Sequence, residues 1–231
     1  MPIESCLEFD IVSTLDWSKS VLDDTKLYSQ DSIMDGHHGT HVDDRPKLYM
    51  LENMPQLKLI NGYNYNMRVL YSRKDYFCMT RVVDEHIIRS IENKMTKYYR
   101  QTYIQNCNYK PRKNDLCATK YGVGRWYRAI CISVEDNENG EQMYVINLLD
   151  WGESFTVKAC ELRRLEMCFI KHPPLAVKYT ILDFKLSNAH KNNMRKLNNN
   201  TYRCTIHSKL GDNNYVISSR TILNILNNQK N

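Results

Sequence analysis

The stretch Asp115–Trp151 constrains the fold of this chain more than any other part of the sequence. Two strand-like arms flank an acidic Asn/Gly turn at 136–140, as in a β-hairpin. Aromatic residues stand near both ends of the stretch, Tyr121 and Trp151 among them. This pattern predicts a small, strongly bent β-barrel with an aromatic pocket at its rim, and such a pocket binds cations.

The segments around this stretch predict further strands and a long helix. Alternating polarity at Tyr65–Ser72 and Tyr76–Val83 predicts two strands. A helix from about Glu85 to Tyr103 follows, with Asp84 at its N-cap and apolar residues on one face. Strands are also expected at 116–120, 126–135, 142–149, 154–157, 175–184, 201–208 and 215–219, and short helical pieces at 160–165, 187–197 and 221–227. The strands outside the bent barrel could together make one five-stranded OB-like barrel.

The cysteines and the lack of long apolar runs indicate a protein that stays inside the cell. No apolar run approaches the roughly 20 residues of a membrane span, and the N-terminus lacks the regions of a signal peptide. No cysteine or histidine spacing completes a zinc site, so we expect neither a metal nor a cofactor. Four of the eight cysteines lie in apolar strand-like runs and are predicted to be buried free thiols: Cys78, Cys117, Cys131 and Cys204.

The charge divides the chain into two parts. Residues 1–45 hold ten acidic and three basic residues, and we expect them to form an acidic, flexible arm. The remaining residues, 46–231, carry 29 bases and 16 acids. This basic excess is compatible with binding of a polyanion such as RNA, but scattered, solvated lysines and arginines would produce the same net charge.

Short motifs in the second half of the chain occur in a characteristic order. They are Cys117-Ala118 followed by Tyr121, the run Trp126–Ala129, the turn Asp150–Glu153, the run Leu162–Leu165 and the run Pro173–Ala176. Over about residues 46–227 this order resembles the extended Tudor domain. The resemblance implies a mainly β fold with α-helices, in which a Tudor β-barrel and a staphylococcal-nuclease-like (SN-like) OB-fold barrel are joined by a long helix. It places the SN-like halves at about 46–106 and 166–231, and the Tudor core at about 112–160.

The resemblance also implies a function. Many members of this family act as scaffolds in the germline piRNA pathway of RNA silencing, in cytoplasmic perinuclear granules called nuage. They bind the arginine-rich N-terminal tails of Piwi-clade Argonaute proteins, and the arginine, often symmetrically dimethylated, enters a cage of four aromatic walls. The chain is therefore expected to be a non-catalytic peptide-binding module, with other Tudor proteins as further partners and no membrane partner.

The residues that match the arginine cage are Tyr121, Tyr127, Leu148, Trp151 and Glu153. The third wall, Leu148, is not aromatic, and Glu153 stands where the family usually has an Asn. A Leu offers dispersion without an aromatic quadrupole, whereas a Glu can accept two hydrogen bonds from a guanidinium. Because methylation removes N–H donors that a Glu would use, we hypothesise that this cage tolerates or prefers unmethylated arginine.

Several residues of these motifs could have a structural role instead of binding a ligand. Tyr121 and Tyr127 could be part of the barrel core. Trp126 is expected to pack between the barrel and the helix because it alternates away from Tyr127. Asp150 is expected to stabilise its own turn through local hydrogen bonds.

The sequence also fits two other functions, and it argues against an enzyme. The cage could be vestigial, in which case the domain would act as a scaffold through another surface or the acidic arm. The OB half could instead bind single-stranded RNA. An enzyme is not expected, because the strands that match the nuclease fold carry Arg68 and Arg81 but no paired carboxylates, and no catalytic motif is present.

Overall fold

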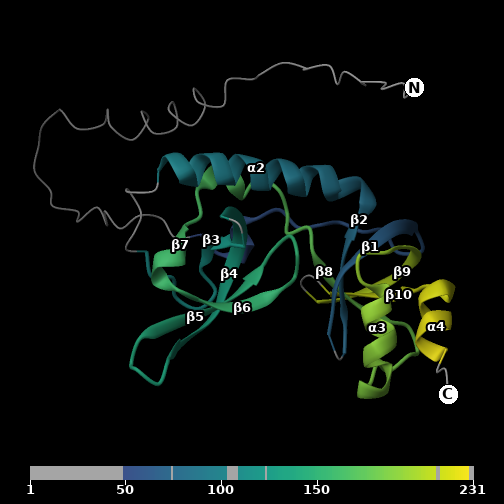
Figure 1. Ribbon diagram of the computed structural model, residues 1–231. Coiled ribbons are helices and arrows are strands. Elements are labelled where there is room, and N and C mark those ends of the chain that lie inside the picture. Colours follow the sequence, from purple (N-terminus) through teal and green to yellow (C-terminus); the bar gives the residue numbers. More distant parts are fainter. Residues whose placement is uncertain (1–48, 74, 103–108, 123, 212–213, 229–231) are drawn as a thin grey trace, which may run out of the picture. The chain divides into compact units, whose positions relative to one another are not determined.

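The computed structural model describes residues 49–231 except 74, 103–108, 123, 212–213 and 229–231 (Figure 1). These residues belong to one compact unit, Lys47–Asn231. The predicted arm, 1–45, lies outside the described residues, so its character and the boundary at residue 46 stay predictions.

Five strands close into a barrel in the order β1-β2-β8-β10-β9. These strands are β1 (Asn64–Ser72), β2 (Phe77–Arg81), β8 (Val177–Ile181), β9 (Thr201–Gly211) and β10 (Asn214–Ser218). Neighbouring strands are antiparallel except β8 and β10, which run parallel. The strands come from both sides of the Asp115–Trp151 stretch, which is the arrangement predicted from the sequence.

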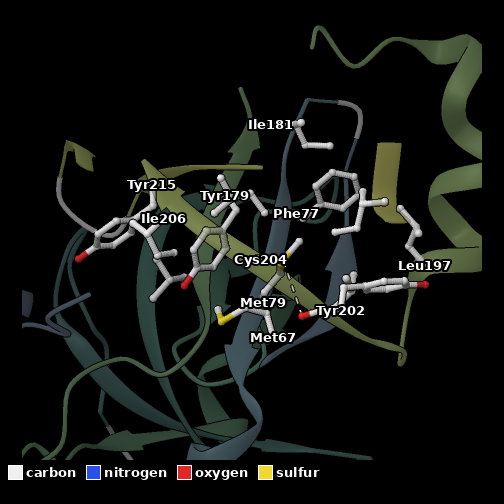
Figure 2. Packing of buried hydrophobic residues seen from close by; sticks show 14 of the residues in the cluster. Met67, Phe77, Met79, Tyr179, Ile181, Leu197, Tyr202, Cys204, Ile206 and Tyr215 are labelled. Atoms are coloured by element: carbon white, nitrogen blue, oxygen red, sulfur yellow. Dashed lines mark hydrogen bonds between the residues drawn. The ribbon is translucent and has the colours of Figure 1, made fainter. Parts of the chain in front are cut away.

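The interior of the closed barrel is filled by apolar side chains from every strand (Figure 2). Met67 and Met79 are fully buried and lie near Tyr179 and Cys204 in this cluster. Buried residues alternate along β1, β8, β9 and β10, which puts them on the inner face, whereas β2 is buried on both faces. Cys204 is a buried free thiol, as predicted, and so are Cys78, Cys117 and Cys131.

The bent sheet has five strands in the order β6-β5-β4-β3-β7. They are β3 (Leu116–Tyr121), β4 (Arg125–Asp136), β5 (Gln142–Leu148), β6 (Ser154–Lys158) and β7 (Leu162–Arg164). The pairing of β4 with β5 shifts between Cys131 and Ser133, a bulge of the kind that bends a long strand. The sheet thereby folds around its own buried cluster, which includes Ala129, Tyr144 and Ile146.

One predicted element in this sheet was wrong. The run Cys160–Leu165 was expected to form a single helical turn. The structure has a 3₁₀ turn at Ala159–Glu161 and then strand β7, which pairs with β3. Leu162 is fully buried in the sheet cluster, and the burial of its side chain outweighs the local helical tendency of this short run.

Helix α2 (Glu85–Gln101) connects the closed barrel to the bent sheet in sequence and packs on strand β4 (Figure 1). Its buried residues Ile91 and Met95 join Leu116 and Trp126 in one apolar cluster. Asp84 stands at the N-cap position as predicted. Its carboxylate accepts hydrogen bonds from Arg81 at 2.6 and 2.9 Å and makes no capping bond.

Short helices complete the described part of the chain. They are η1 (Leu51–Asn53), η2 (Val82–Asp84), η3 (Ala159–Glu161), η4 (Met167–Phe169), η5 (Asn188–His190), α3 (Lys191–Leu197) and α4 (Arg220–Asn227). Helices α3 and α4 pack side by side against the closed barrel, and Asn193 of α3 donates hydrogen bonds to main-chain carbonyls at the end of α4. Leu197 and Leu226 extend into the barrel cluster.

The turn between β5 and β6 joins the bent sheet to the closed barrel. Gly152 in this turn has a φ of +76°, and a Cβ at this position would lie 2.6 Å from Cys78 Cβ on β2. Only a glycine fits here, because both the backbone angle and the approach of β2 exclude a side chain. The turn therefore holds a fixed position against the closed barrel.

Asp150, in the same turn, does not act locally as the sequence predicted. Its carboxylate forms an ion pair with the buried Arg128 of β4 and accepts a hydrogen bond from the main-chain N–H of Leu175 at 3.2 Å. These partners are 22 and 25 residues away in sequence. Asp150 is thus a long-range anchor of the turn that carries Trp151.

Candidate functional site

Three aromatic rings from three strands meet at one edge of the bent sheet. Tyr121, the last residue of β3, is 44% exposed and stacks on Phe155 of β6, with ring centroids 4.4 Å apart and planes at 28°. Tyr127 of β4 meets Tyr121 edge to face at 6.3 Å and 70°. The structure therefore brings Tyr121 and Tyr127 together, as predicted, and adds Phe155.

The strand pairing explains this meeting. Thr119 of β3 lies opposite Tyr127, and Tyr121 lies opposite Arg125, so these four side chains share one face of the β3–β4 hairpin. That face leads into the core of the sheet. Phe155 was not identified from the sequence, although it stands two residues before the buried Val157 and therefore on the same side of β6.

Trp151 is held against helix α2. Its indole N–H donates a hydrogen bond to Oε1 of Glu92, and its ring is partly buried between the α2 cluster and the sheet cluster. A large aromatic residue in a turn is exposed to solvent unless another element covers it. Here the covering element is α2.

Glu92 is a functional candidate that the sequence analysis missed. Its carboxylate is buried, and desolvation raises its pKa despite the hydrogen bond from Trp151, with Asp150 raising it further and Arg125 and Arg89 opposing the rise. The sequence position of Glu92 could have revealed its burial, because it lies four residues after Ile88 and therefore on the buried face of the helix.

Glu92 and Arg125 connect the Trp151 side of the site to the tyrosines. Oε2 of Glu92 lies 4.0 Å from Nη1 of Arg125. Burial raises the pKa of Tyr127, the charge of Glu92 adds to this rise, and Arg125 opposes it. Part of the effect of Arg125 is a hydrogen bond that its side chain makes to Tyr127. We refer to Tyr121, Arg125, Tyr127, Trp151, Phe155 and Glu92 together as the rim cluster.

The other two predicted cage residues have different surroundings. Leu148 is only 2% exposed and packs in the core of the sheet beneath the aromatic edge. Glu153 is partly exposed, and its main-chain carbonyl accepts hydrogen bonds from the Leu148 N–H at 2.8 Å and from Nδ2 of Asn147 at 3.3 Å. Their roles toward a bound arginine stay predictions.

The opposite face of the β3–β4 hairpin packs against α2. Trp126 is 2% exposed and lies 4.9 Å from the ring of Tyr99, which confirms its predicted place between sheet and helix. A cleft of about 230 Å³ opens beside it and is lined by Tyr99, Arg100, Lys120, Gly124 and Trp126. Two of these lining residues are basic, so the cleft favours anions rather than cations.

Within the described parts of 49–231, no group of three or more His, Cys, Asp or Glu side chains is placed to hold a metal ion. None of the helices described for this chain combines the length and apolarity needed to cross a bilayer.

The sequence of this chain matches a known protein family. The Tudor domain family profile matches residues 59–182, which is more than half of the chain. That range contains the bent sheet, α2 and three strands of the closed barrel. No curated protein sequence is similar enough to match this chain.

Several solved extended Tudor domains have the same fold. That of human TDRD1, in complex with a symmetrically dimethylated peptide, is 15% identical, with 74% of this chain and 87% of that chain covered and a TM-score of 0.61. That of Drosophila melanogaster Tudor-SN is 18% identical, with 68% and 75% covered and a TM-score of 0.61. That of Drosophila melanogaster Papi, with an unmethylated Piwi N-terminal peptide, is 15% identical, with 63% and 76% covered and a TM-score of 0.56. At these identities the likeness establishes the fold.

Proposed function

Because this chain belongs to the Tudor domain family, we propose that it is a non-catalytic module that binds arginine-containing segments of disordered protein tails. The observation that carries this proposal is the meeting of Tyr121, Tyr127 and Phe155 at one edge of the sheet, beside the buried carboxylate of Glu92. A guanidinium is flat and delocalised, so it stacks on ring faces while it donates hydrogen bonds to a carboxylate.

The proposed partner is the arginine-rich N-terminal tail of a Piwi-clade Argonaute protein. Extended Tudor domains of the same fold have been solved with such tails, among them that of mouse TDRD1 with a MILI peptide containing dimethylarginine. The proposed place of action is a cytoplasmic ribonucleoprotein granule of the germline piRNA pathway, where the domain would act as a scaffold. Other Tudor proteins are proposed as further partners.

We further propose that the site tolerates or prefers unmethylated arginine, with no clear preference for the methylated form. Leu148, at the position of one cage wall, is buried and presents no ring, and acidic groups are available at Glu92 and Glu153. Each methyl group on an arginine nitrogen replaces an N–H that a carboxylate could accept. The solved Papi domain has been obtained with both an unmethylated and a methylated form of the Piwi peptide, so this fold accommodates either.

Calorimetry of the full chain with one Arg-Gly peptide, unmethylated and symmetrically dimethylated, tests the proposal. Tyr121→Ala should weaken binding roughly 2- to 30-fold, as expected for loss of one cation–π contact. Tyr63→Ala is a matched control, because Tyr63 is also an exposed tyrosine (61%) but precedes β1 of the closed barrel. Equal affinity of wild type and Tyr121→Ala would favour a vestigial cage, and a clear preference for the methylated peptide would refute the proposal about methylation.

A second candidate function is supported by the charge of helix α2. Both acidic residues of this helix are engaged, Glu85 with Arg68 and Glu92 with Trp151. Its exposed residues are uncharged or basic, and the basic ones are His86, Arg89, Lys94, Lys97 and Arg100. We call these five the basic face of α2. It adjoins the cleft lined by Arg100 and Lys120, so α2 is a better candidate for single-stranded RNA than the OB half predicted from the sequence.

Binding of an oligo(U) RNA at several salt concentrations tests this second function. Neutralisation of phosphates by the basic face should give a slope of log K against log salt of roughly −0.7 per phosphate. The pair Lys97→Glu and Arg100→Glu should abolish most of the binding. Lys191→Glu with Arg195→Glu on α3 makes the same change in net charge on exposed residues and should not. A shallow salt dependence, or equal loss in both pairs, would exclude the basic face.

A further inference from the structure

The rim cluster contains an arginine of its own. Arg125 is the first residue of β4 and lies directly opposite Tyr121 in the β3–β4 pairing. Side chains that pair across antiparallel strands lie on the same face, so the Arg125 side chain starts on the aromatic side of the hairpin. Its side chain is 58% exposed, and its guanidinium lies beside Glu92. A cation of the kind we propose as ligand is therefore already present at the site.

The carboxylate that Arg125 faces is unusual for a surface ion pair. The Glu92 side chain is only 7% exposed, and burial of a carboxylate is costly unless hydrogen bonds and a nearby cation compensate it. Trp151 donates one hydrogen bond to Oε1. Arg125 Nη1 is 4.0 Å from Oε2, which is beyond hydrogen-bond distance. The pair is thus held by charge and leaves Oε2 able to accept a closer donor.

A guanidinium that took the place of Arg125 would face this same carboxylate. The Arg125 side chain hydrogen-bonds Tyr127, and its Nη1 lies 4.0 Å from Oε2 of Glu92, so Arg125 adjoins both residues. Each carboxylate oxygen has two lone pairs, so Oε1 can keep the indole N–H of Trp151 while both oxygens accept from an incoming arginine. Two guanidinium groups cannot occupy this position together, because their like charges repel at close range.

We propose that Glu92 is the acidic partner of the bound arginine, and that Arg125 is an internal competitor that must leave Glu92 before the ligand can bind. This inference rests on the proposed arginine-binding function and assigns two residues to it that the family pattern does not identify. Glu92 comes from helix α2, outside the strands and the turn that supply the aromatic side chains. The affinity for the ligand then depends on the difference between two free energies: that of pairing Glu92 with the arginine of the ligand and that of pairing Glu92 with Arg125.

The test compares arginine variants of the full chain in calorimetric titrations with an unmethylated Arg-Gly peptide. Arg125→Gln should bind about 3-fold or more tightly than wild type, since loss of a competing rim charge is worth on the order of 0.5–1 kcal/mol. Arg195→Gln, an exposed arginine of α3, makes the same charge change and should leave the affinity within about twofold. Glu92→Gln, whose amide oxygen can still accept the Trp151 N–H, should weaken binding, and it should remove the gain from Arg125→Gln in the double variant.

The outcomes separate this inference from the function on which it rests. Tighter binding by Arg125→Gln alone, lost when Glu92→Gln is added, supports the competition. Binding that depends on Tyr121 but is equal or weaker in Arg125→Gln overturns it and leaves the proposed function intact. Failure of wild type, Arg125→Gln and Glu92→Gln alike to bind the peptide, with all three folded by circular dichroism, overturns the proposed function and the inference together.

Discussion

Arg128 of β4 and Asp150 of the β5–β6 turn form a two-point ion pair inside the protein, with Nε–Oδ2 and Nη2–Oδ1 separations of 2.8 and 2.5 Å. The remaining donors of Arg128 bind the carbonyls of Phe169, His172 and Pro173 at 2.8 to 3.0 Å. One guanidinium thus ties the turn that carries Trp151 to the segment leading into β8. The pair is a structural anchor of the candidate site and does not contact the proposed ligand.

Asp150→Asn should destabilise the protein by about 3–5 kcal/mol, because the buried Arg128 would lose its counter-charge. The free energy of unfolding from urea titration measures this. Lys158→Gln is the control, since it removes one partner of the exposed ion pair between Lys158 and Glu141 and should leave the unfolding midpoint unchanged. Similar midpoints for Asp150→Asn and this control would contradict the anchoring role.

Gly152→Ala should destabilise the junction between the bent sheet and the closed barrel. The new Cβ would lie 2.6 Å from Cys78 Cβ and closer still to its Sγ, in addition to the cost of a positive φ. We expect a loss of more than about 2 kcal/mol in the free energy of unfolding. Gly140→Ala separates the two effects, because Gly140 has a φ of +71° but open space around it, and should cost only about 1–2 kcal/mol. Equal losses would show that the contact with Cys78 does not matter.

Phe155→Ala should weaken binding of the Arg-Gly peptide even if Phe155 never touches it. Phe155 stacks on Tyr121, and an aromatic pair of this kind contributes roughly 0.5–1.5 kcal/mol, or about 2- to 13-fold in affinity if it holds Tyr121 in place. Calorimetry of the two single variants and of the double variant with Tyr121→Ala measures the coupling. If Phe155 acts through Tyr121, the double variant binds no more weakly than Tyr121→Ala alone. Additive losses would instead assign Phe155 its own contact with the peptide.

The thiols of the sheet and barrel cores should be chemically inert in the folded protein. Burial raises the pKa of Cys78 to about 11 and that of Cys131 to about 11, so little thiolate is present near neutral pH. Cys160 is exposed. Iodoacetamide at pH 8 followed by mass spectrometry should find Cys160 modified before Cys78 and Cys131, which should react only after addition of denaturant. Early modification of Cys78 would show that the junction at Gly152 opens readily.

Much of this fold could be predicted because it depends on local periodicity. The strands β1 to β6 and helix α2 followed from alternation and from the three-and-four spacing of apolar residues. The short strand β7 did not, because three residues carry too little pattern to distinguish a strand edge from a helical turn. Its pairing with β3, on which its conformation depends, joins residues more than forty positions apart in sequence.

The candidate site was only partly predictable for the same physical reason. Tyr121 and Tyr127 were found because they match cage positions of the extended Tudor pattern, and the observed β3–β4 pairing places both on one face. The partners of Asp150 and Trp151 could not, because Arg128 and Glu92 approach from other elements. Glu92 carried a usable signal, since an acidic residue on the apolar face of a helix is buried and therefore needs a partner.

The stability contributed by Glu92 should depend on pH in a direction set by its burial. Desolvation raises the pKa of Glu92 in the folded protein above its ordinary value of 4.5, even though Arg89 of α2 and Arg125 of β4 act in the opposite sense. The folded state therefore holds the proton more tightly than the unfolded state does. The contribution is fully present below pH 4.5 and is lost as the pH rises through the higher folded pKa.

The Glu92→Gln side chain does not titrate. The free energy of unfolding of this variant should therefore rise relative to that of wild type between pH 4.5 and the folded pKa of Glu92, and the difference should level off at higher pH. Urea unfolding of both proteins from about pH 4 to about pH 8 measures the free energy of unfolding of Glu92→Gln minus that of wild type. If this difference fell with rising pH, the Trp151 hydrogen bond and the two arginines would outweigh the burial of the carboxylate.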